Sequence, residues 1–303
     1  VLSGTAAGGQ LMNTTEVENY PGFSKGIMGP DLMIEMMEQA KRFGAILETE
    51  NVTRVDLGGK TQKIKNSKNQ NIELKKIYIG EKEIQAKTVI VSTGASSAML
   101  NVGEVKFMGR GVSTCAVCDA AFFRDKVAYV VGGGDAAIED ALALAKYAKE
   151  VYMVHRRDSF KASKIMQERA LNNPKVKILW NSEVIGVEGE DVLKTLKIKN
   201  SKTQNVEELE TDGLFLAIGH FPTTKLFEGQ LDLDEKGFLK TGINGSLEVD
   251  WMEGYPTMTS VPGVFGAGDV VDFKYKQAVT AAGMGCQAAL DVEKYLTGKT
   301  SSY

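Results

Sequence analysis

The sequence predicts an α/β protein with two related dinucleotide-binding domains of the βαβ kind, and two observations lead to this prediction. First, an apolar run over residues 126–131 enters Gly132-Gly133-Gly134, helical apolar spacing follows over residues 138–145, and a second apolar run covers Val151–Val154. Second, a similar polar segment occurs at residues 64–71 and 198–205, each time ahead of an apolar run that ends at glycine. Such a repeat predicts two domains of one kind, each with a hairpin before its last strand, although hairpins also share turn composition by chance.

The glycine turn is the most specific of these elements. Gly132-x-Gly134-x-x-Ala137 lies between a predicted strand and a predicted helix, the setting in which such glycines let the backbone approach a pyrophosphate. The pyrophosphate then lies at the helix N-terminus, where unpaired N–H groups favour an anion. We therefore predict that a dinucleotide binds at this turn.

A basic turn after the second apolar run selects the nucleotide. An NAD site usually has an acidic residue there, but this chain reads His155-Arg156-Arg157, with Lys161 shortly after. Guanidinium groups suit a 2′-phosphate, which they bind with paired hydrogen bonds. The turn therefore predicts NADPH, and a solvated basic turn is the alternative.

A dithiol precedes the glycine turn. Cys115 and Cys118 are separated by two residues, a spacing that closes a small disulfide ring and lets one thiol lower the pKa of the other. Half of a zinc site is the alternative, but the only further cysteine and histidines are Cys286, His155 and His220, and none forms a second ligand pair. We predict disulfide redox chemistry and no metal.

Composition excludes several classes of function. With 303 residues, a net charge of −3 and no long apolar run, the chain predicts about two domains, no nucleic-acid partner and no membrane helix. Three cysteines do not make a secreted disulfide framework, so a cytoplasmic location is predicted. The chain begins at Val1 rather than Met, which indicates that an N-terminal segment is missing.

Elements on both sides of the central unit complete the pattern. Pro30 and Asp31 open a predicted helix with an apolar stripe from Met33 to Phe43, and Gly44 ends it. Apolar runs over residues 88–91 and 214–218 lead into glycine turns, and residues 264–269 form a third such strand end before a helix from about Ala278.

Several motifs, in this order and at similar spacing, resemble the low-molecular-weight thioredoxin reductases. They are Gly8-Gly9-Gln10-Leu11, Glu18-Asn19-Tyr20-Pro21-Gly22, Cys115-Ala116-Val117-Cys118-Asp119, the Gly132 turn, His155-Arg156-Arg157, Ala217-Ile218-Gly219-His220 and Gly266-Ala267-Gly268-Asp269. The resemblance implies a discontinuous FAD domain over residues 1–104 and 223–303, with an NADPH domain inserted at residues 105–222. It also implies FAD and NADPH as cofactors, thioredoxin as partner and a homodimer.

The resemblance also implies roles for individual residues. Cys115 and Cys118 would be the redox pair, with Cys118 against the flavin and Asp119 as proton donor or relay. Residues matching flavin-contacting motifs are Gly9, Gln10, Thr14, Asn19, Val52, Thr93, Gly94, Asp269, Lys276, Gln277 and Ala278. Those matching the NADPH site are Gly132, Gly134, Ala137, His155, Arg156, Arg157 and Lys161.

Three departures from the family pattern leave alternatives open. Lys161 and Lys276 stand where the family usually has arginine, and residues 248–258 look inserted. The family's first G-x-G-x-x-G, which binds the FAD pyrophosphate, is not found, so we expect the N-terminal strand-helix unit to be missing and the chain to be isolated without flavin. The alternatives are therefore a reductase serving a peroxidase, a ferredoxin-dependent relative, which Arg156 and Arg157 disfavour, or a nucleotide-binding module without flavin.

Overall fold

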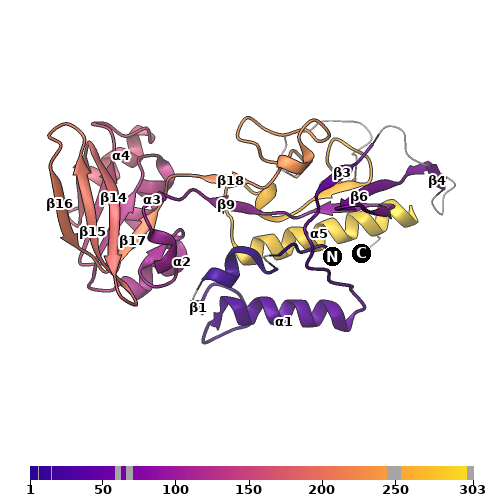
Figure 1. The fold of residues 1–303 in the computed structure, drawn as a ribbon, viewed down its shortest axis with the longest axis horizontal. Coiled ribbons are helices and arrows are strands. Elements are labelled where there is room, and N and C mark those ends of the chain that lie inside the picture. The colour runs from indigo at the N-terminus through magenta and orange to yellow at the C-terminus, as the bar shows by residue number, and fades with distance from the viewer. Residues whose placement is uncertain (6, 15, 59–62, 66–70, 244–253, 299–303) are drawn as a thin grey trace. The chain divides into compact units, whose positions relative to one another are not determined.

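A computed structural model describes residues 1–5, 7–14, 16–58, 63–65, 71–243 and 254–298. The chain divides into two compact units (Figure 1). Unit 1 comprises Val1–Met12, Tyr20–Ser96 and Phe221–Tyr303, and unit 2 comprises Asn13–Asn19 and Ser97–His220. The chain passes between them on both sides of residues 13–19 and again within the short strands β9 (Ala95–Ser97) and β18 (His220–Pro222). The predicted boundaries of functional domains, after residues 104 and 222, stay predictions.

Unit 2 is built on a five-stranded parallel sheet with the order β10-β17-β11-β12-β13. The strands are β10 (Val112–Ser113), β11 (Val127–Val131), β12 (Glu150–His155), β13 (Val176–Trp180) and β17 (Gly213–Leu216). Helices α3 (Asp135–Ala145) and α4 (Lys164–Leu171) connect β11, β12 and β13. The predicted βαβ unit is therefore confirmed, and its central strand β11 lies in the middle of the sheet.

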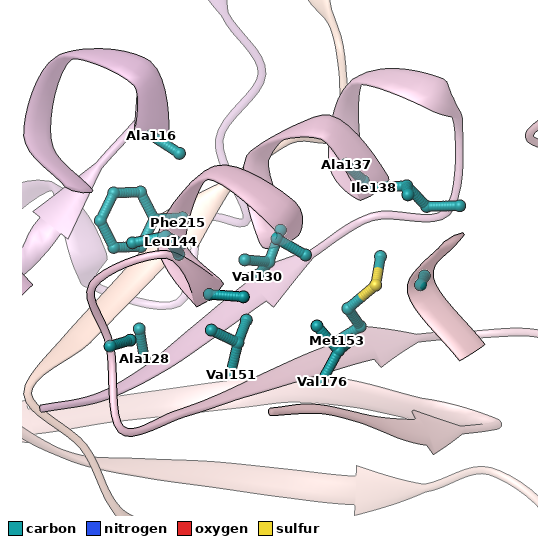
Figure 2. Packing of buried hydrophobic residues seen from close by; sticks show 14 of the residues in the cluster. Ala116, Ala128, Val130, Ala137, Ile138, Leu144, Val151, Met153, Val176 and Phe215 are labelled. Carbon is teal, nitrogen blue, oxygen red and sulfur yellow. The ribbon is translucent and has the colours of Figure 1, made fainter. Parts of the chain in front are cut away.

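A buried apolar cluster holds α3 against this sheet. Figure 2 shows Val130, Val151 and Met153 pointing from the strands toward Ile138 and Leu144 on the helix, and all five side chains are fully buried. Apolar side chains removed from water contribute about 25 cal/mol per Å² to the stability of the fold. The buried cluster therefore holds α3 firmly on the sheet, which positions the helix N-terminus relative to the strand ends.

The second face of the sheet carries an antiparallel sheet of three strands. These are β14 (Ser182–Gly189), β15 (Leu193–Asn200) and β16 (Val206–Glu210). Val184, Leu196 and Ile198 are buried in one cluster with Tyr129 and Leu214 of the parallel sheet. The β15–β16 hairpin confirms the hairpin predicted from residues 198–205.

Unit 1 has smaller sheets and two long helices. Strands β3 (Arg54–Asp56), β6 (Lys75–Ile79) and β7 (Lys82–Ala86) are antiparallel, and β8 (Val89–Val91) pairs in parallel with β19 (Val264–Gly266). Strands β4 (Lys63–Lys65) and β5 (Asn71–Glu73) form the other predicted hairpin, whose residues 66–70 lie outside the described ranges. Helix α5 spans Ala278–Thr297 and confirms the helix predicted from about Ala278.

Helix α1 (Gly29–Arg42) confirms one prediction and corrects another. The helix begins beside Pro30 and ends before Gly44, which has a φ of +88°. The predicted apolar stripe is wrong at its end, because the Phe43 side chain is 78% exposed. Phe43 is the first residue beyond the helix, and its ring contacts the Arg42 guanidinium at 4.9 Å instead of the core. Leu32, which the stripe omitted, is the buried side chain.

The remaining short elements complete the order along the chain. They are η1 (Gly9–Asn13), β1 (Glu16–Val17), β2 (Ile27–Met28), η2 (Glu104–Phe107), α2 (Ala116–Asp119), η3 (Ala120–Phe123), η4 (Lys225–Phe227) and η6 (Gly268–Val270). In the described part of the chain, no helix combines the length and the apolarity needed to cross a membrane.

Candidate redox and dinucleotide site

Cys115 and Cys118 form a disulfide at the start of the short helix α2. Their Cα atoms lie 5.4 Å apart, and the Cys115 Sγ accepts a hydrogen bond from the Cys118 N–H at 3.3 Å. Strand β10 leads into this turn, and its Ser113 Oγ accepts a hydrogen bond from the Cys115 N–H at 3.0 Å. The backbone thus fixes both cysteines before any partner binds.

The dithiol helix is anchored on one side and open on the other. Ala116 and Ala120 are buried in the cluster that holds α3, and Figure 2 shows Ala116 directed toward Phe215 and Leu144. Val117, between the cysteines, has 66% of its side chain exposed. A disulfide supported in this way can meet a second protein without unfolding its own support.

Asp119 places a proton-binding group directly after the disulfide. Its Oδ1 atom is buried, and no hydrogen-bond partner for it occurs among the described residues. Burial raises the pKa of this carboxyl above its ordinary value, and a hydrogen bond from Ser113 opposes the rise. A buried carboxyl that retains its proton to higher pH is suited to exchange that proton with a nearby thiol.

The glycine turn follows β11 at the sheet edge where the basic turn follows β12. Val131 pairs with Val154, so Gly132 and His155 come next at the same end of two parallel strands. A Cβ on Gly132, whose φ is +154°, would lie 2.5 Å from the Ala217 carbonyl oxygen. A Cβ on Gly134 would meet no atom within 4 Å. Gly132 is therefore required by packing, whereas Gly134 leaves open space at the N-terminus of α3.

The predicted basic residues around this turn divide into two groups. Arg156, Arg157 and Lys161 are exposed, and the Lys161 N–H donates to the Gly133 carbonyl oxygen at 2.8 Å, which places it beside the glycine turn. His155 is 7% exposed; its ring packs beneath Gly133 and its Nε2 lies 3.0 Å from the Ser159 carbonyl oxygen. The exposed cations can bind a phosphate directly, and His155 supports the loop that carries them.

Unit 1 has a second strand-end turn of different character. Val91 pairs with Gly266 in parallel, so Thr93-Gly94 and Gly268-Asp269 follow neighbouring strand ends. Burial, with the negative charge of Asp272, raises the pKa of Asp269 to about 6. The Asp272 carboxylate accepts hydrogen bonds from the N–H groups of Lys274, Tyr275 and Lys276 at 2.7–3.0 Å.

The other predicted flavin contacts occupy varied positions. Gly9 and Gln10 lie in η1, Thr14 and Asn19 flank β1, and Gln277 caps α5 ahead of Ala278. Thr93 donates through Oγ1 to the Thr223 carbonyl oxygen at 2.6 Å. Val52 packs against the apolar cluster of unit 1, and Ala137 is fully buried under the glycine turn. These two act through packing in the structure, and their predicted cofactor contacts stay predictions.

Three polar residues that shape the site were missed by the sequence analysis. Ser113 bonds the dithiol turn, Ser163 donates both its N–H and its Oγ–H to Asp135 at 2.9 and 2.7 Å, and Asp272 closes the loop before α5. Asp272 and Ser113 carried a local signal, since a side-chain oxygen that accepts a backbone N–H group two to four residues later is a common turn device. Ser163 bonds Asp135 from 28 residues away in the sequence.

Each unit has a turn whose residues fit one dinucleotide. The open Gly134, the N-terminus of α3 and three exposed cations form a cradle for the pyrophosphate and the 2′-phosphate of NADPH. In unit 1, the acidic turn at Asp269 and the capped N-terminus of α5 suit hydroxyl and ring-carbonyl groups of a flavin cofactor. No group of three or more metal-ligating side chains occurs among the residues the structure describes.

The fold and the site define a class: a dinucleotide-binding protein whose redox disulfide lies on a short helix packed against the helix that follows the glycine turn. Residues 1–285 match the family of pyridine nucleotide-disulphide oxidoreductases, and the chain belongs to this family. Members of the thioredoxin reductase branch use FAD and NADPH.

The following four similar proteins all carry the name thioredoxin reductase. The chain is 49% identical to thioredoxin reductase of Streptomyces clavuligerus over 98% of this chain and 85% of that protein. It is 46% identical to thioredoxin reductase 1 of Saccharomyces cerevisiae, over 98% and 88% of the two chains. Among solved structures, thioredoxin reductase from Streptococcus pyogenes has a TM-score of 0.84 at 36% identity, over 98% of this chain and 90% of that chain. The enzyme from Giardia duodenalis has a TM-score of 0.80 at 38% identity, over 95% and 87%.

Proposed function

We propose that this protein is a thioredoxin-disulfide reductase that uses NADPH and FAD. The observation that supports this most is the Cys115–Cys118 disulfide, which is held on the same helix and sheet that form the NADPH turn. The similar proteins, with 45–49% identity over nearly the whole chain, carry the name thioredoxin reductase. They disfavour the alternative of a binding module without turnover.

When bound, NADPH and FAD would supply the hydride and electron-transfer chemistry. The chain's residues bind and orient these groups and carry the electrons further. Gly132 allows the close packing of the turn, Gly134 leaves room for the pyrophosphate, and Arg156, Arg157 and Lys161 hold the 2′-phosphate. Reduction of the Cys115–Cys118 bond breaks one S–S bond, adds two electrons and requires two protons for the full dithiol, one of which Asp119 is placed to supply.

The reduced pair then serves the protein partner. One thiolate attacks the disulfide of thioredoxin, which gives a mixed disulfide and releases one partner thiolate. The second cysteine attacks the mixed bond, so that the Cys115–Cys118 bond is formed again and thioredoxin leaves reduced. The exposed Val117 lies between the two sulfur-bearing residues, on the open side that a partner must approach.

The test is NADPH-driven reduction of thioredoxin by the flavin-loaded chain. Cys115→Ser and Cys118→Ser should each reduce the rate to background, while NADPH still reduces the flavin, because hydride transfer to the flavin does not involve the disulfide. Cys286→Ser is the matched control, since Cys286 is an exposed cysteine on α5, and it should retain the wild-type rate. Equal loss in all three variants would contradict the assignment.

We further propose that the protein is a cytoplasmic homodimer. The three cysteines, two of them in a redox pair, suit a reducing compartment, and the resemblance to the family implies the dimer. Light scattering on the protein as it elutes from a size-exclusion column should give twice the chain mass of 32.9 kDa. A mass equal to one chain would contradict the dimer.

A further inference from the structure

A second carboxyl group, besides that of Asp119, lies against the dithiol turn. Asp140 is in the middle of α3, and its carboxylate accepts a hydrogen bond from the backbone N–H of Ala116. Ala116 is the residue that follows Cys115, and it is fully buried. This bond therefore ties the first turn of the dithiol helix to the helix that begins at the glycine turn.

We infer that Asp140 is a positioning residue for the redox pair, which anchors the Cys115–Cys118 turn through the Ala116 N–H and sets how readily its thiols ionise. The inference rests on the proposed function only in treating Cys115 and Cys118 as the redox pair. Two contacts support it: the hydrogen bond itself, and the packing of Ala116 and Ala120 against Ala137, Ala141 and Leu144 of α3. The apolar contacts hold the two helices together, which keeps the Asp140 backbone close to the Ala116 N–H.

The charge of Asp140 is itself sensitive to pH. Burial is the largest influence and raises the pKa of this carboxyl to about 7, the bond from Ala116 opposes the rise, and the negative charge of Glu139 adds to it. Above that pH the group carries a negative charge beside the dithiol, and this charge disfavours a thiolate. Below that pH the Asp140 carboxyl is neutral, and the pKa of the thiols is lower than it is beside the charged carboxylate.

Other charged groups near Asp140 affect its pKa and that of the thiols. On its own helix the charged neighbour is Glu139, which is exposed. On the dithiol helix the titratable groups are Asp119 and, once reduced, Cys115 and Cys118. Helix α4 also packs on α3 and carries Lys164, Glu168 and Arg169, but none of these is among the causes of the raised pKa.

The test measures thiol reactivity in the reduced full-length protein without NADPH or thioredoxin. Rates of alkylation by iodoacetamide are followed from roughly pH 4 to 8.5, which spans ordinary carboxyl and thiol pKa values. The wild-type profile should show an inflection near pH 7 besides that of the thiols. Asp140→Asn retains an oxygen acceptor for the Ala116 N–H but cannot titrate, so this inflection should disappear.

The rate itself should also change. If the neutral side chain lowers the thiol pKa by one unit, the thiolate fraction rises up to tenfold at a pH well below the thiol pKa, and the lower nucleophilicity reduces the gain in rate to at most about threefold. This gain should be seen just above pH 7 and should vanish as the pH approaches the thiol pKa of about 8.5. Glu139→Gln should keep the inflection but move it to lower pH, because one negative charge beside Asp140 is gone. Glu168→Gln, an exposed carboxylate on α4, is the control and should match the wild-type profile.

Each outcome decides the inference. An Asp140→Asn profile that superimposes on the wild type would overturn it. If Asp140→Asn does not fold, the pair of wild type and Glu139→Gln decides, since an inflection that is absent or unmoved would overturn it equally. A failure of the proposed function would appear differently, as lack of thioredoxin reduction with the alkylation result intact.

Discussion

The two strand-end turns of the molecule follow the same plan but have opposite electrostatic character. In unit 2, a buried strand ends just before Gly132 and Asp135 follows; in unit 1, a buried strand ends at Gly266 and Asp269 follows. Asp135 accepts two hydrogen bonds from Ser163, which lower the pKa of its carboxyl, and basic side chains surround its turn. Asp269 is desolvated, and its pKa is raised.

This difference shows how one backbone design serves two parts of the chemistry. A turn that offers open backbone N–H groups and guanidinium groups attracts phosphate. A turn whose carboxyl groups lie partly buried repels phosphate and instead accepts hydrogen bonds from hydroxyl or ring N–H groups. We therefore propose that NADPH binds at the turn of unit 2 and the flavin at that of unit 1, and three predictions test this division.

The largest expected effect is on cofactor selection. Replacing both Arg156 and Arg157 with alanine removes charge-assisted hydrogen bonds of about 1.5–3 kcal/mol each, so the NADPH Kd should rise by at least roughly tenfold per contact. The NADH Kd and the flavin content should change little, because neither ligand uses the 2′-phosphate contacts. Calorimetric titration measures both constants. Arg169→Ala, on α4 of the same unit, is the control, and equal weakening of NADPH and NADH would refute the phosphate role.

A smaller effect distinguishes the two glycines of the unit 2 turn, since Gly132 is required by packing and Gly134 leaves room for the ligand. Gly132→Ala places a methyl group against the Ala217 carbonyl at a φ of +154°, so the free energy of unfolding should fall by about 1–3 kcal/mol. Gly134→Ala meets no neighbour and should cost at most about 1 kcal/mol as a poorer helix cap.

The same two variants should rank in the opposite order for NADPH binding, measured on folded protein by titration. The methyl group of Gly134→Ala occupies the open space where the pyrophosphate approaches, so the NADPH Kd should rise by roughly tenfold or more. Wild-type affinity in Gly134→Ala would mean that the pyrophosphate binds elsewhere.

The smallest effect concerns stability and pH, where the two aspartates should differ in sign. Because the pKa of Asp269 is raised to about 6, the stability it contributes is fully present below its unfolded pKa of 3.8 and is lost as pH rises through 6. Asp269→Asn should therefore raise the Tm of flavin-free protein at neutral pH by about 2–4 °C, the shift that corresponds to about 1 kcal/mol.

Asp135→Asn provides the matched comparison. Its folded pKa is lowered, so its contribution is present above the unfolded value of 3.8 and lost as pH falls through the folded pKa. The variant should lower the Tm at neutral pH and become indistinguishable from wild type in acid. Calorimetric melts across this range measure both variants, and shifts of the same sign would contradict the contrast between the turns.

The sequence predicted local elements well and long-range contacts poorly. The βαβ unit and the dithiol were visible because periodicity and spacing are local properties, and β11, α3 and β12 confirm the first. Phe43 continued an apolar stripe in sequence, but only the end of α1 at Arg42 decides that its ring lies outside the core. Ser163 and Asp140 reach Asp135 and Ala116 across the fold, and no spacing rule could have paired them.

The most direct test of the electron route is a count of thiols after anaerobic reduction by NADPH. The flavin-loaded protein is treated with excess NADPH, quenched with an alkylating reagent and analysed by mass for labels on Cys115 and Cys118. Electron transfer through the disulfide predicts that both cysteines are labelled in the reduced protein and neither in the oxidised protein, while Cys286 is labelled in both. Oxidation of NADPH with bleaching of the flavin but an intact Cys115–Cys118 disulfide would contradict it.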